Sequence, residues 1–327
     1  MTRDLDEDDV RFRPNRRSTR PRSKLRPTHA AAVAGIVVGV DRGRIACELA
    51  DGTLVMAVKA RALGRRGLIV GDRVRITGDV SGTWDTLARV VHVEPRRTLL
   101  RRTADDVEAT ERPLVANADQ LGIVVSVADP APRTGFVDRC LVAAYDAGIA
   151  PLLVVTKTDL ADPAEFLSGY EALDVPAVAV ARTHGIAGLA DRLHDHTTVL
   201  IGQSGVGKST LVNRLVPTAD RATGVVNEVT GRGRHTSTSA VLLDLPGGGA
   251  IIDTPGVRSF GLNHVSPDTV AHAFADLADG TQECPRGCTH DETDCALDDW
   301  VATGHAPSAR LASLRRILRA RAEAPEY

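Results

Sequence analysis

The chain has 327 residues, of which 43% are hydrophobic and 25% charged, and its formal net charge is −2. This length suggests about two domains with room for a small third, and it is enough to bury a sizeable core. The first residues are charged where a secretory signal needs an apolar core, and the longest apolar run, residues 30–40, is well short of the roughly 20 residues that span a bilayer. We therefore expect a cytoplasmic protein that does not associate with a membrane.

Residues 1–29 form a charged tail. An acidic cluster at residues 4–9 precedes residues 11–26, which contain arginine, lysine and proline but no acid. Such a composition cannot bury enough apolar surface to order itself, so we predict a disordered tail. Its basic half could contact the phosphates of a nucleic acid or simply keep the chain soluble.

Residues 30–100 predict a small β-barrel. Short apolar stretches alternate with turn signals such as Asp51-Gly52, and the OB-fold is the commonest nucleic-acid-binding barrel with this pattern. Arginines are numerous and Trp84 is the only aromatic residue in this region. That composition favours contact with the backbone or shape of a nucleic acid over stacking on bases. A solvated barrel surface is the alternative.

Residues 112–262 change to alternating apolar strands and helices. Continuous apolar runs at 120–128, 150–156 and 176–181 are separated by stretches with helical periodicity. This alternation predicts a parallel sheet covered by helices on both faces. Two further runs within 240–256 predict a hairpin.

A guanine-reading loop is indicated by Thr156-Lys157-Thr158-Asp159, which follows an apolar strand. The Asp159 carboxylate can accept hydrogen bonds from both the N1–H and the exocyclic NH2 of guanine. Adenine has no matching pair of donors and would leave the carboxylate unpaired, so the loop selects guanine.

A phosphate-binding loop of the pattern G-x-x-x-x-G-K-[ST] lies between a predicted strand and a predicted helix. Its glycines allow backbone N–H groups to turn toward phosphates, Lys208 reaches the outer phosphates, and Ser209 binds Mg2+. The predicted nucleotide-binding residues of this loop are Gly202, Gln203, Ser204, Gly205, Val206, Gly207, Lys208, Ser209 and Thr210.

Two more stretches are expected to face the γ-phosphate. Asp253 and Gly256 form an Asp-x-x-Gly pattern, in which Asp253 would hold the Mg2+ shell and the Gly256 N–H would face the γ-phosphate. Residues 231–240 are mostly Gly, Arg, Ser and Thr, as in a segment ordered by γ-phosphate and Mg2+. Thr236 is the predicted Mg2+ ligand and Thr238 the alternative, while an ordinary loop is the remaining interpretation.

These motifs occur in an unusual order, because an ordinary GTPase has its guanine loop after its phosphate loop. The fold can be retained if the original termini are joined through residues 188–201 and the chain is opened elsewhere. Such a permutation is tolerated because domain termini usually lie at the surface and close together. We therefore predict a circularly permuted α/β P-loop GTPase domain over residues 112–262. The region after Gly256 would then follow the switch directly, and we expect its position to depend on the nucleotide.

Residues 263–327 predict a small zinc-binding and helical domain. Its cysteine cluster offers three thiolates and one imidazole, the closed tetrahedral set of a structural zinc ion; a loop of free thiols is the alternative, and a disulfide is not expected in a reducing cytosol. The predicted zinc ligands are Cys284, Cys288, His290 and Cys295.

The last predicted element is an amphipathic helix over residues 308–323. Leucines and one isoleucine occupy one face, and arginines occupy the other, so we interpret the polar face as a second basic surface. The acids Asp291, Glu292 and Asp294 beside the cysteine cluster are expected to be solvated.

Over about residues 30–320 the chain resembles the RsgA family, the bacterial GTPases that depend on the small ribosomal subunit. The resemblance rests on the stretches NADQ, VDRCL, TKTDL, GQSGVGKSTLVN, GRGRHTST and IIDTPGVRSFGL and on the cysteine cluster. It implies a late-acting assembly factor that binds the small subunit, with ribosomal RNA as the surface met by the barrel. It also implies that the subunit stimulates GTP hydrolysis.

The chain departs from the family pattern at several positions. Thr156 replaces the usual Asn, Ala181-Arg182 replaces Ser-Ala in the next guanine-side loop, and the cysteine cluster is one residue shorter in each half. Val257 stands where many GTPases carry a water-orienting Gln, an apolar choice that the family shares. This predicts slow intrinsic hydrolysis, with His235 as a candidate for the water-positioning group and a packing or RNA-binding role as its alternative.

We thus predict a monomeric GTPase that binds GTP with Mg2+, contains one structural Zn2+ and acts on the small ribosomal subunit and its rRNA. The alternative is an RNA-binding module whose affinity depends on the GTP state and whose hydrolysis is negligible. A weaker alternative, an ATP-dependent nucleic-acid enzyme, conflicts with Asp159. The predicted catalytic residues are Lys208, Ser209, His235, Thr236, Asp253 and Gly256, with Mg2+ bound by Ser209 and Thr236.

Overall fold

The computed structural model describes residues 31–322, apart from residues 42, 65–66, 84–85, 106–107, 220–239, 256–259, 261 and 263–264. The predicted disordered tail therefore lies outside the described residues. The chain divides into Met1–Ala31 and Ala32–Tyr327, and all that follows concerns the second unit. None of the helices described there is long and apolar enough to cross a membrane.

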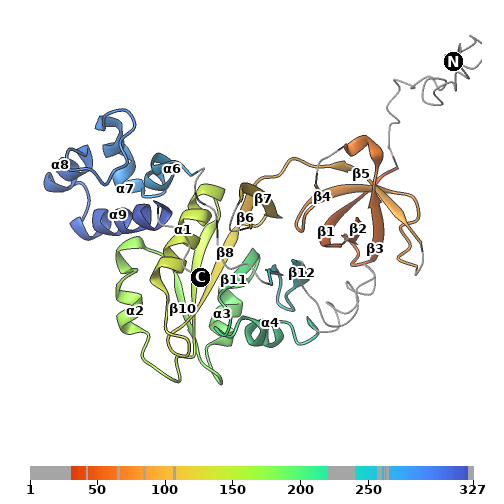
Figure 1. Cartoon of the computed structure of the whole chain (residues 1–327). Coiled ribbons are helices and arrows are strands. Elements are labelled where there is room, and N and C mark those ends of the chain that lie inside the picture. The colour runs from red at the N-terminus through yellow and green to blue at the C-terminus, as the bar shows by residue number, and fades with distance from the viewer. Residues whose placement is uncertain are drawn as a thin grey trace, which may run out of the picture. The chain divides into compact units, whose positions relative to one another are not determined.

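The first part of this unit is a closed five-stranded barrel, as predicted (Figure 1). It consists of β1 (Val33–Asp41), β2 (Arg44–Leu49), β3 (Leu54–Lys59), the 3-10 helix η2 (Arg61–Leu63), β4 (Arg73–Thr77) and β5 (Ala88–Val93). The strands pair in the ring β1-β2-β3-β5-β4, and β4 closes back onto β1. Along β4, Val74 and Ile76 are buried while Arg73 and Arg75 are exposed, because alternate residues of a strand face opposite sides.

A hairpin that the sequence did not predict follows the barrel, formed by β6 (Leu99–Asp105) and β7 (Glu108–Ala116). Its end is tied to the barrel, because Ala116 N donates to Val70 O at 3.0 Å and Asn117 Nδ2 donates to Gly71 O at 2.8 Å. Gly71 has a φ of +86°, and a Cβ there would lie 1.9 Å from Ala116 O. Glycine is therefore required for this close approach.

The central sheet has the predicted strand–helix alternation. Its elements are β8 (Gln120–Ser126), α1 (Thr134–Ala147), β9 (Ala150–Thr156), α2 (Ala164–Ser168), η3 (Glu171–Leu173), β10 (Ala177–Val180), α3 (Ile186–Leu193), β11 (Thr197–Gly202), α4 (Lys208–Leu215), β12 (Val241–Asp244) and β13 (Ala250–Asp253). The strand order is β10-β9-β8-β11-β13-β12, and all neighbours are parallel except the predicted β12–β13 hairpin. Helices α1 and α2 cover one face and α3 and α4 the other (Figure 1). Every residue of β8 is buried, as a strand covered on both faces requires.

The C-terminal region is helical and packs on α1 through its last helix (Figure 1). It consists of α6 (Pro267–His272), α7 (Ala275–Ala278), η4 (Asp279–Glu283), α8 (Ala296–Ala302) and α9 (Ser308–Ala322). The predicted apolar stripe of α9 is buried and comprises Leu311, Leu314, Ile317 and Leu318.

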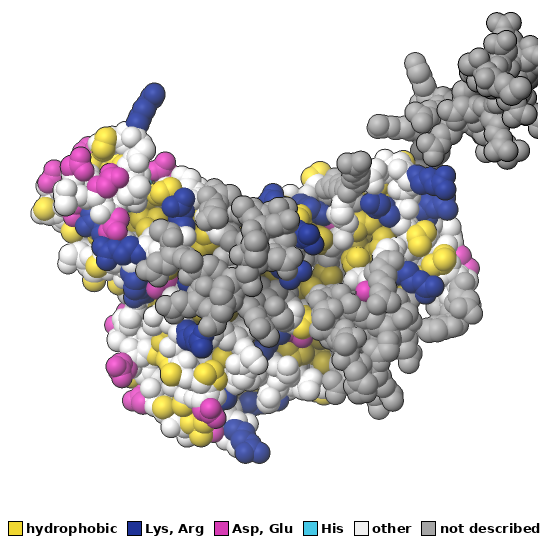
Figure 2. All heavy atoms as spheres, in the orientation of Figure 1, with side chains coloured by type: hydrophobic (Ala, Val, Ile, Leu, Met, Phe, Trp, Pro, Cys, Tyr) yellow, Lys and Arg dark blue, Asp and Glu magenta, His cyan; other side chains and the backbone are white. Residues whose placement is uncertain are grey.

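The prediction of a second basic surface on α9 was wrong, because four of its five arginines are paired with acids and the fifth, Arg321, donates to Val265 O. Arg310 contacts Asp174 and Asp276, Arg315 contacts Asp298, Arg316 contacts Asp138, and Arg319 contacts Asp291. Asp291, which was expected to be solvated, is instead paired with Arg319. Figure 2 shows acidic side chains gathered over the region of α8, with Lys and Arg side chains close by.

Candidate functional site

The phosphate loop connects β11 to α4 and is shaped by its glycines. Gly205 and Gly207 have φ values of +83° and +93°, which side chains with a Cβ rarely adopt. At Gly202 a Cβ would lie 2.7 Å from Val124 O in β8, so this position must also lack a side chain. Helix α4 begins at Lys208, and its free N–H groups and positive dipole end therefore face the loop.

Asp253 lies beside the phosphate loop, because β13 runs parallel to β11 with Asp253 opposite Leu200. Thr254 Oγ1 donates to Leu200 O at 2.8 Å and fixes this strand end. The ammonium group of Lys208, whose side chain is 12% exposed, donates to the carboxylate of Asp253. The structure thus brings together the residues that were predicted to bind the outer phosphates and the Mg2+ shell. Gly256, His235, Thr236 and Thr238 lie outside the described residues.

The predicted guanine loop follows β9 and contacts the phosphate loop. Thr156 Oγ1 donates to Val206 O at 2.6 Å, and Val125 O lies 3.3 Å away. The hydroxyl that replaces the usual amide therefore still links the two loops. Lys157, with a φ of +58°, donates from Nζ to Asp129 O in the segment after β8.

The second guanine-side loop follows β10 and contacts the first. Arg182 N donates to Asp159 Oδ1 at 3.2 Å, and Arg214 of α4 donates to Ala181 O at 2.8 Å. At Ala181-Arg182, where the family has Ser-Ala, the contact to Asp159 is thus made by a backbone N–H. Asp159 itself is exposed, so its second oxygen can face a base. The sequence did not indicate Asp129 or Arg182 as partners, because backbone atoms carry no residue signature.

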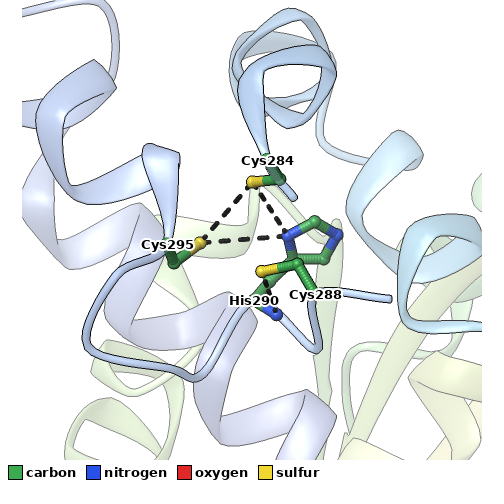
Figure 3. Close-up of side chains that lie close together, drawn as sticks. All are labelled: Cys284, Cys288, His290 and Cys295. Atoms are coloured by element: carbon green, nitrogen blue, oxygen red, sulfur yellow. Dashed lines mark hydrogen bonds between the residues drawn. The ribbon is translucent and has the colours of Figure 1, made fainter. Parts of the chain in front are cut away.

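The predicted zinc ligands converge in space (Figure 3). Cys284 Sγ lies 3.8 Å from Cys295 Sγ and 3.6 Å from His290 Nδ1, and Cys295 Sγ lies 3.9 Å from His290 Nδ1. All four donor atoms, including Cys288 Sγ, lie within 4.8 Å of one another. Tetrahedral Zn2+ with bonds of about 2.3 Å to sulfur and about 2.0 Å to nitrogen requires donor separations of about 3.5–3.8 Å. The residues present therefore fit a closed four-coordinate metal.

Two contacts outside this cluster orient its ligands. His290 Nε2 lies 2.9 Å from Asp268 Oδ1, so the proton belongs on Nε2 and Nδ1 is free to bind a metal. Arg315 donates to His290 O at 3.0 Å and forms a bidentate pair with Asp298 at 2.7 and 2.9 Å. Sequence spacing could not reveal Asp268, which precedes His290 by 22 residues.

Burial raises the pKa of each thiol in the cluster, Cys284, Cys288 and Cys295. A bound cation acts in the opposite direction, because thiolates are the form that ligates metal. Metal binding by this cluster therefore releases protons, and its affinity is expected to rise with pH.

A parallel sheet that carries a phosphate loop and a guanine-type loop in inverted chain order defines a circularly permuted P-loop GTPase fold. The solved structure of YloQ, described as a circularly permuted GTPase, shares this fold with a TM-score of 0.65 and 22% identity, covering 93% of this chain and 100% of that one. The structure of YjeQ from Thermotoga maritima has a TM-score of 0.66 and 27% identity, covering 89% and 99%.

Comparison with known sequences gives the family. The RsgA GTPase family model matches residues 93–263. A relative from Pseudomonas aeruginosa is 40% identical over 261 residues, or 77% of this chain and 75% of its own. One from Azotobacter vinelandii is 37% identical over 306 residues, or 90% and 87%. Both relatives are called small ribosomal subunit biogenesis GTPase RsgA. This chain belongs to the RsgA family.

Proposed function

We propose that this chain is a GTPase that acts in the maturation of the small ribosomal subunit. The observation that carries the proposal is the junction of the two nucleotide loops, in which Thr156 donates to Val206 O beside Lys208 and Asp253. Family membership supplies the biological setting. We further propose that the small subunit itself stimulates GTP hydrolysis by this chain. We also propose that the chain acts in the cytoplasm as a monomer.

In this proposal the phosphate loop from Gly202 to Thr210 holds the phosphates, and Thr156 to Asp159 reads guanine. Lys208 leaves the carboxylate of Asp253 to contact the outer phosphates. Ser209 and Asp253 then lie where they can hold Mg2+, which when bound neutralises charge on the phosphates. Thr236, His235 and Gly256 remain predictions for the Mg2+ shell, the attacking water and the γ-phosphate.

We assign the barrel to ribosome binding and the C-terminal region to a structural role. The domains are taken as residues 30–100, 112–262 and 263–327. The barrel region is proposed to contact rRNA, and the exposed arginines among its described residues are Arg44, Arg61, Arg73, Arg75, Arg89 and Arg97. Cys284, Cys288, His290 and Cys295 are proposed to hold one Zn2+ that has no open coordination position and is therefore structural.

The test is GTP hydrolysis by the purified protein with and without small ribosomal subunits, with ATP as the control nucleotide. We expect a large increase with subunits for GTP, and none for ATP or for Lys208→Ala. Tight GTP binding without any increase would favour the alternative, an RNA-binding module governed by its GTP state. An Asp159→Asn variant with unchanged nucleotide preference would contradict the guanine assignment.

A further inference from the structure

A cavity of about 670 Å3 opens at the N-terminal end of α1, beside the phosphate loop. Residues 132–136 line it together with Asp138 and Arg139, and the other walls come from Gln203 of the phosphate loop and from Arg316, Arg319 and Ala320 of α9. Among the described residues that line it are four arginines and one acid, Asp138. Arg316 is bidentate to Asp138 at 3.1 and 3.2 Å, and Arg319 is bidentate to Asp291 at 2.7 and 2.8 Å. Arg133 and Arg139 therefore carry the charge of the wall that no acid of the described residues hydrogen-bonds.

Arg139 is the unusual residue of this cavity. Arg139 is only 7% exposed, and its Nε has no hydrogen-bond partner. In the described part of the chain no carboxylate forms an ion pair with it. Arginine cannot lose its proton in a protein, so this buried cation has a desolvation cost, which the nearby carboxylate of Asp138 offsets only in part because it is also paired with Arg316. An anion in the cavity would offset that cost.

The N-terminal end of α1 presents further donors at the same place. No side chain caps this helix. The N–H groups of Phe136 and Val137 donate to Arg133 O at 3.2 and 3.3 Å, whereas those of Thr134 and Gly135 have no partner among the described residues. The guanidinium of Arg139 reaches back to this turn, since its NH1 lies 3.7 Å from the position of a Cβ on Gly135. Free N–H groups, the helix dipole and a guanidinium therefore converge.

We propose that the N-terminal end of α1, with Arg133 and Arg139, binds the phosphate group of a small molecule at a site separate from the guanine nucleotide. A tetrahedral oxyanion can accept from the paired N–H groups and from the planar guanidinium at once. The cavity is in the size range of small-molecule sites, so it accommodates either inorganic phosphate or a phosphomonoester. Through Gln203 the occupant contacts the phosphate loop, so its binding and nucleotide binding are expected to influence each other reciprocally.

The test uses the full chain loaded with zinc, Mg2+ and a non-hydrolysable GTP analogue, so that the nucleotide site is filled. Binding of inorganic phosphate, pyrophosphate and AMP is measured separately by titration calorimetry, with chloride held constant. The variants are Arg139→Met and Arg133→Met, which remove charge while keeping an aliphatic side chain. Thr134→Pro removes one N–H at the first helical position, where proline is well tolerated. Arg192→Met removes an exposed arginine of α3 that does not line the cavity.

We expect saturable binding that weakens about tenfold or more in Arg139→Met and Arg133→Met, less in Thr134→Pro, and not at all in Arg192→Met. Binding of inorganic phosphate would identify the free anion as sufficient, and binding of AMP alone would identify a phosphomonoester. Absence of saturable binding for all three probes would overturn the proposal, as would binding that Arg133→Met and Thr134→Pro leave unchanged. These two exposed positions keep the test decisive even if Arg139→Met does not fold.

Discussion

Replacing Thr156 with valine is expected to weaken nucleotide binding through the phosphate loop. Thr156 is 5% exposed, and its hydroxyl donates to the carbonyl of Val206, which is 3% exposed, at 2.6 Å. Valine has nearly the same shape but no donor, so the Val206 carbonyl loses this partner. Leaving a buried acceptor unpaired costs about 1–3 kcal/mol. If that cost falls on the loop conformation that binds phosphate, the affinity for GDP decreases by roughly 5- to 150-fold.

The assay is titration of a fluorescent GDP analogue in the presence of Mg2+, together with the urea midpoint of unfolding. Thr156→Ser keeps the hydroxyl and is expected to bind GDP nearly as the unaltered chain does. Thr77→Val, in the barrel, is the control for the loss of a hydroxyl elsewhere. If Thr156→Val binds GDP with unchanged affinity, the hydroxyl does not hold the phosphate loop. Our account of how Thr156 replaces the Asn that is usual in the family would then be wrong.

Three further predictions concern the contacts between regions. Asp268→Ala removes the carboxylate that orients the imidazole of the cysteine cluster and should lower zinc affinity by about 10- to 100-fold, measured by competition with a chelator. Arg316→Met removes the bidentate partner of the buried carboxylate of Asp138, 3% exposed, and leaves it the weaker electrostatic contribution of Arg139. This should destabilise the zinc-loaded protein by about 3 kcal/mol, and adding Asp138→Leu should recover most of the loss in urea unfolding. The pKa of Glu48 is raised from 4.5 to about 7 by burial and by the nearby carboxylate of Asp244. The folded state therefore holds this proton up to about pH 7 while the unfolded chain releases it near 4.5, so stability should decline as pH rises between these values. Glu48→Gln should flatten that decline, and an unchanged pH profile of the thermal midpoint would contradict it.

Nucleotide chemistry was readable from sequence because its motifs are local. The phosphate loop places nine consecutive residues between a strand and a helix, and the guanine-type loop ends an apolar strand, so residue order alone predicts which backbone groups face a ligand. The same holds for the cysteine cluster, whose four predicted ligands lie within residues 284–295. Strand periodicity also predicted the barrel, since alternation at Val74 and Ile76 is a property of the chain itself.

The α9 arginines show where such reasoning fails. Periodicity correctly predicted that Leu314 and Ile317 face inward, but it could not predict what the opposite face would meet. Arg316 finds Asp138, which is 178 positions earlier in the chain, and an amphipathic pattern contains no information on a partner at that separation. A charge assigned to solvent from sequence is therefore neutralised by the fold.

The sequence alone determined the permuted order of the nucleotide motifs, the barrel and the Cys3His cluster, because each depends on residues that are close together in the chain. Only the tertiary structure decided how those parts are joined. It placed the Thr156 hydroxyl on the phosphate loop, Asp268 behind His290, and the guanidinium of Arg139, whose Nε has no hydrogen-bond partner, at the start of α1. Each of these is a contact between distant segments or a contact to backbone atoms. Neither kind leaves a signature in residue order, because only packing brings the groups together and determines which of them have partners.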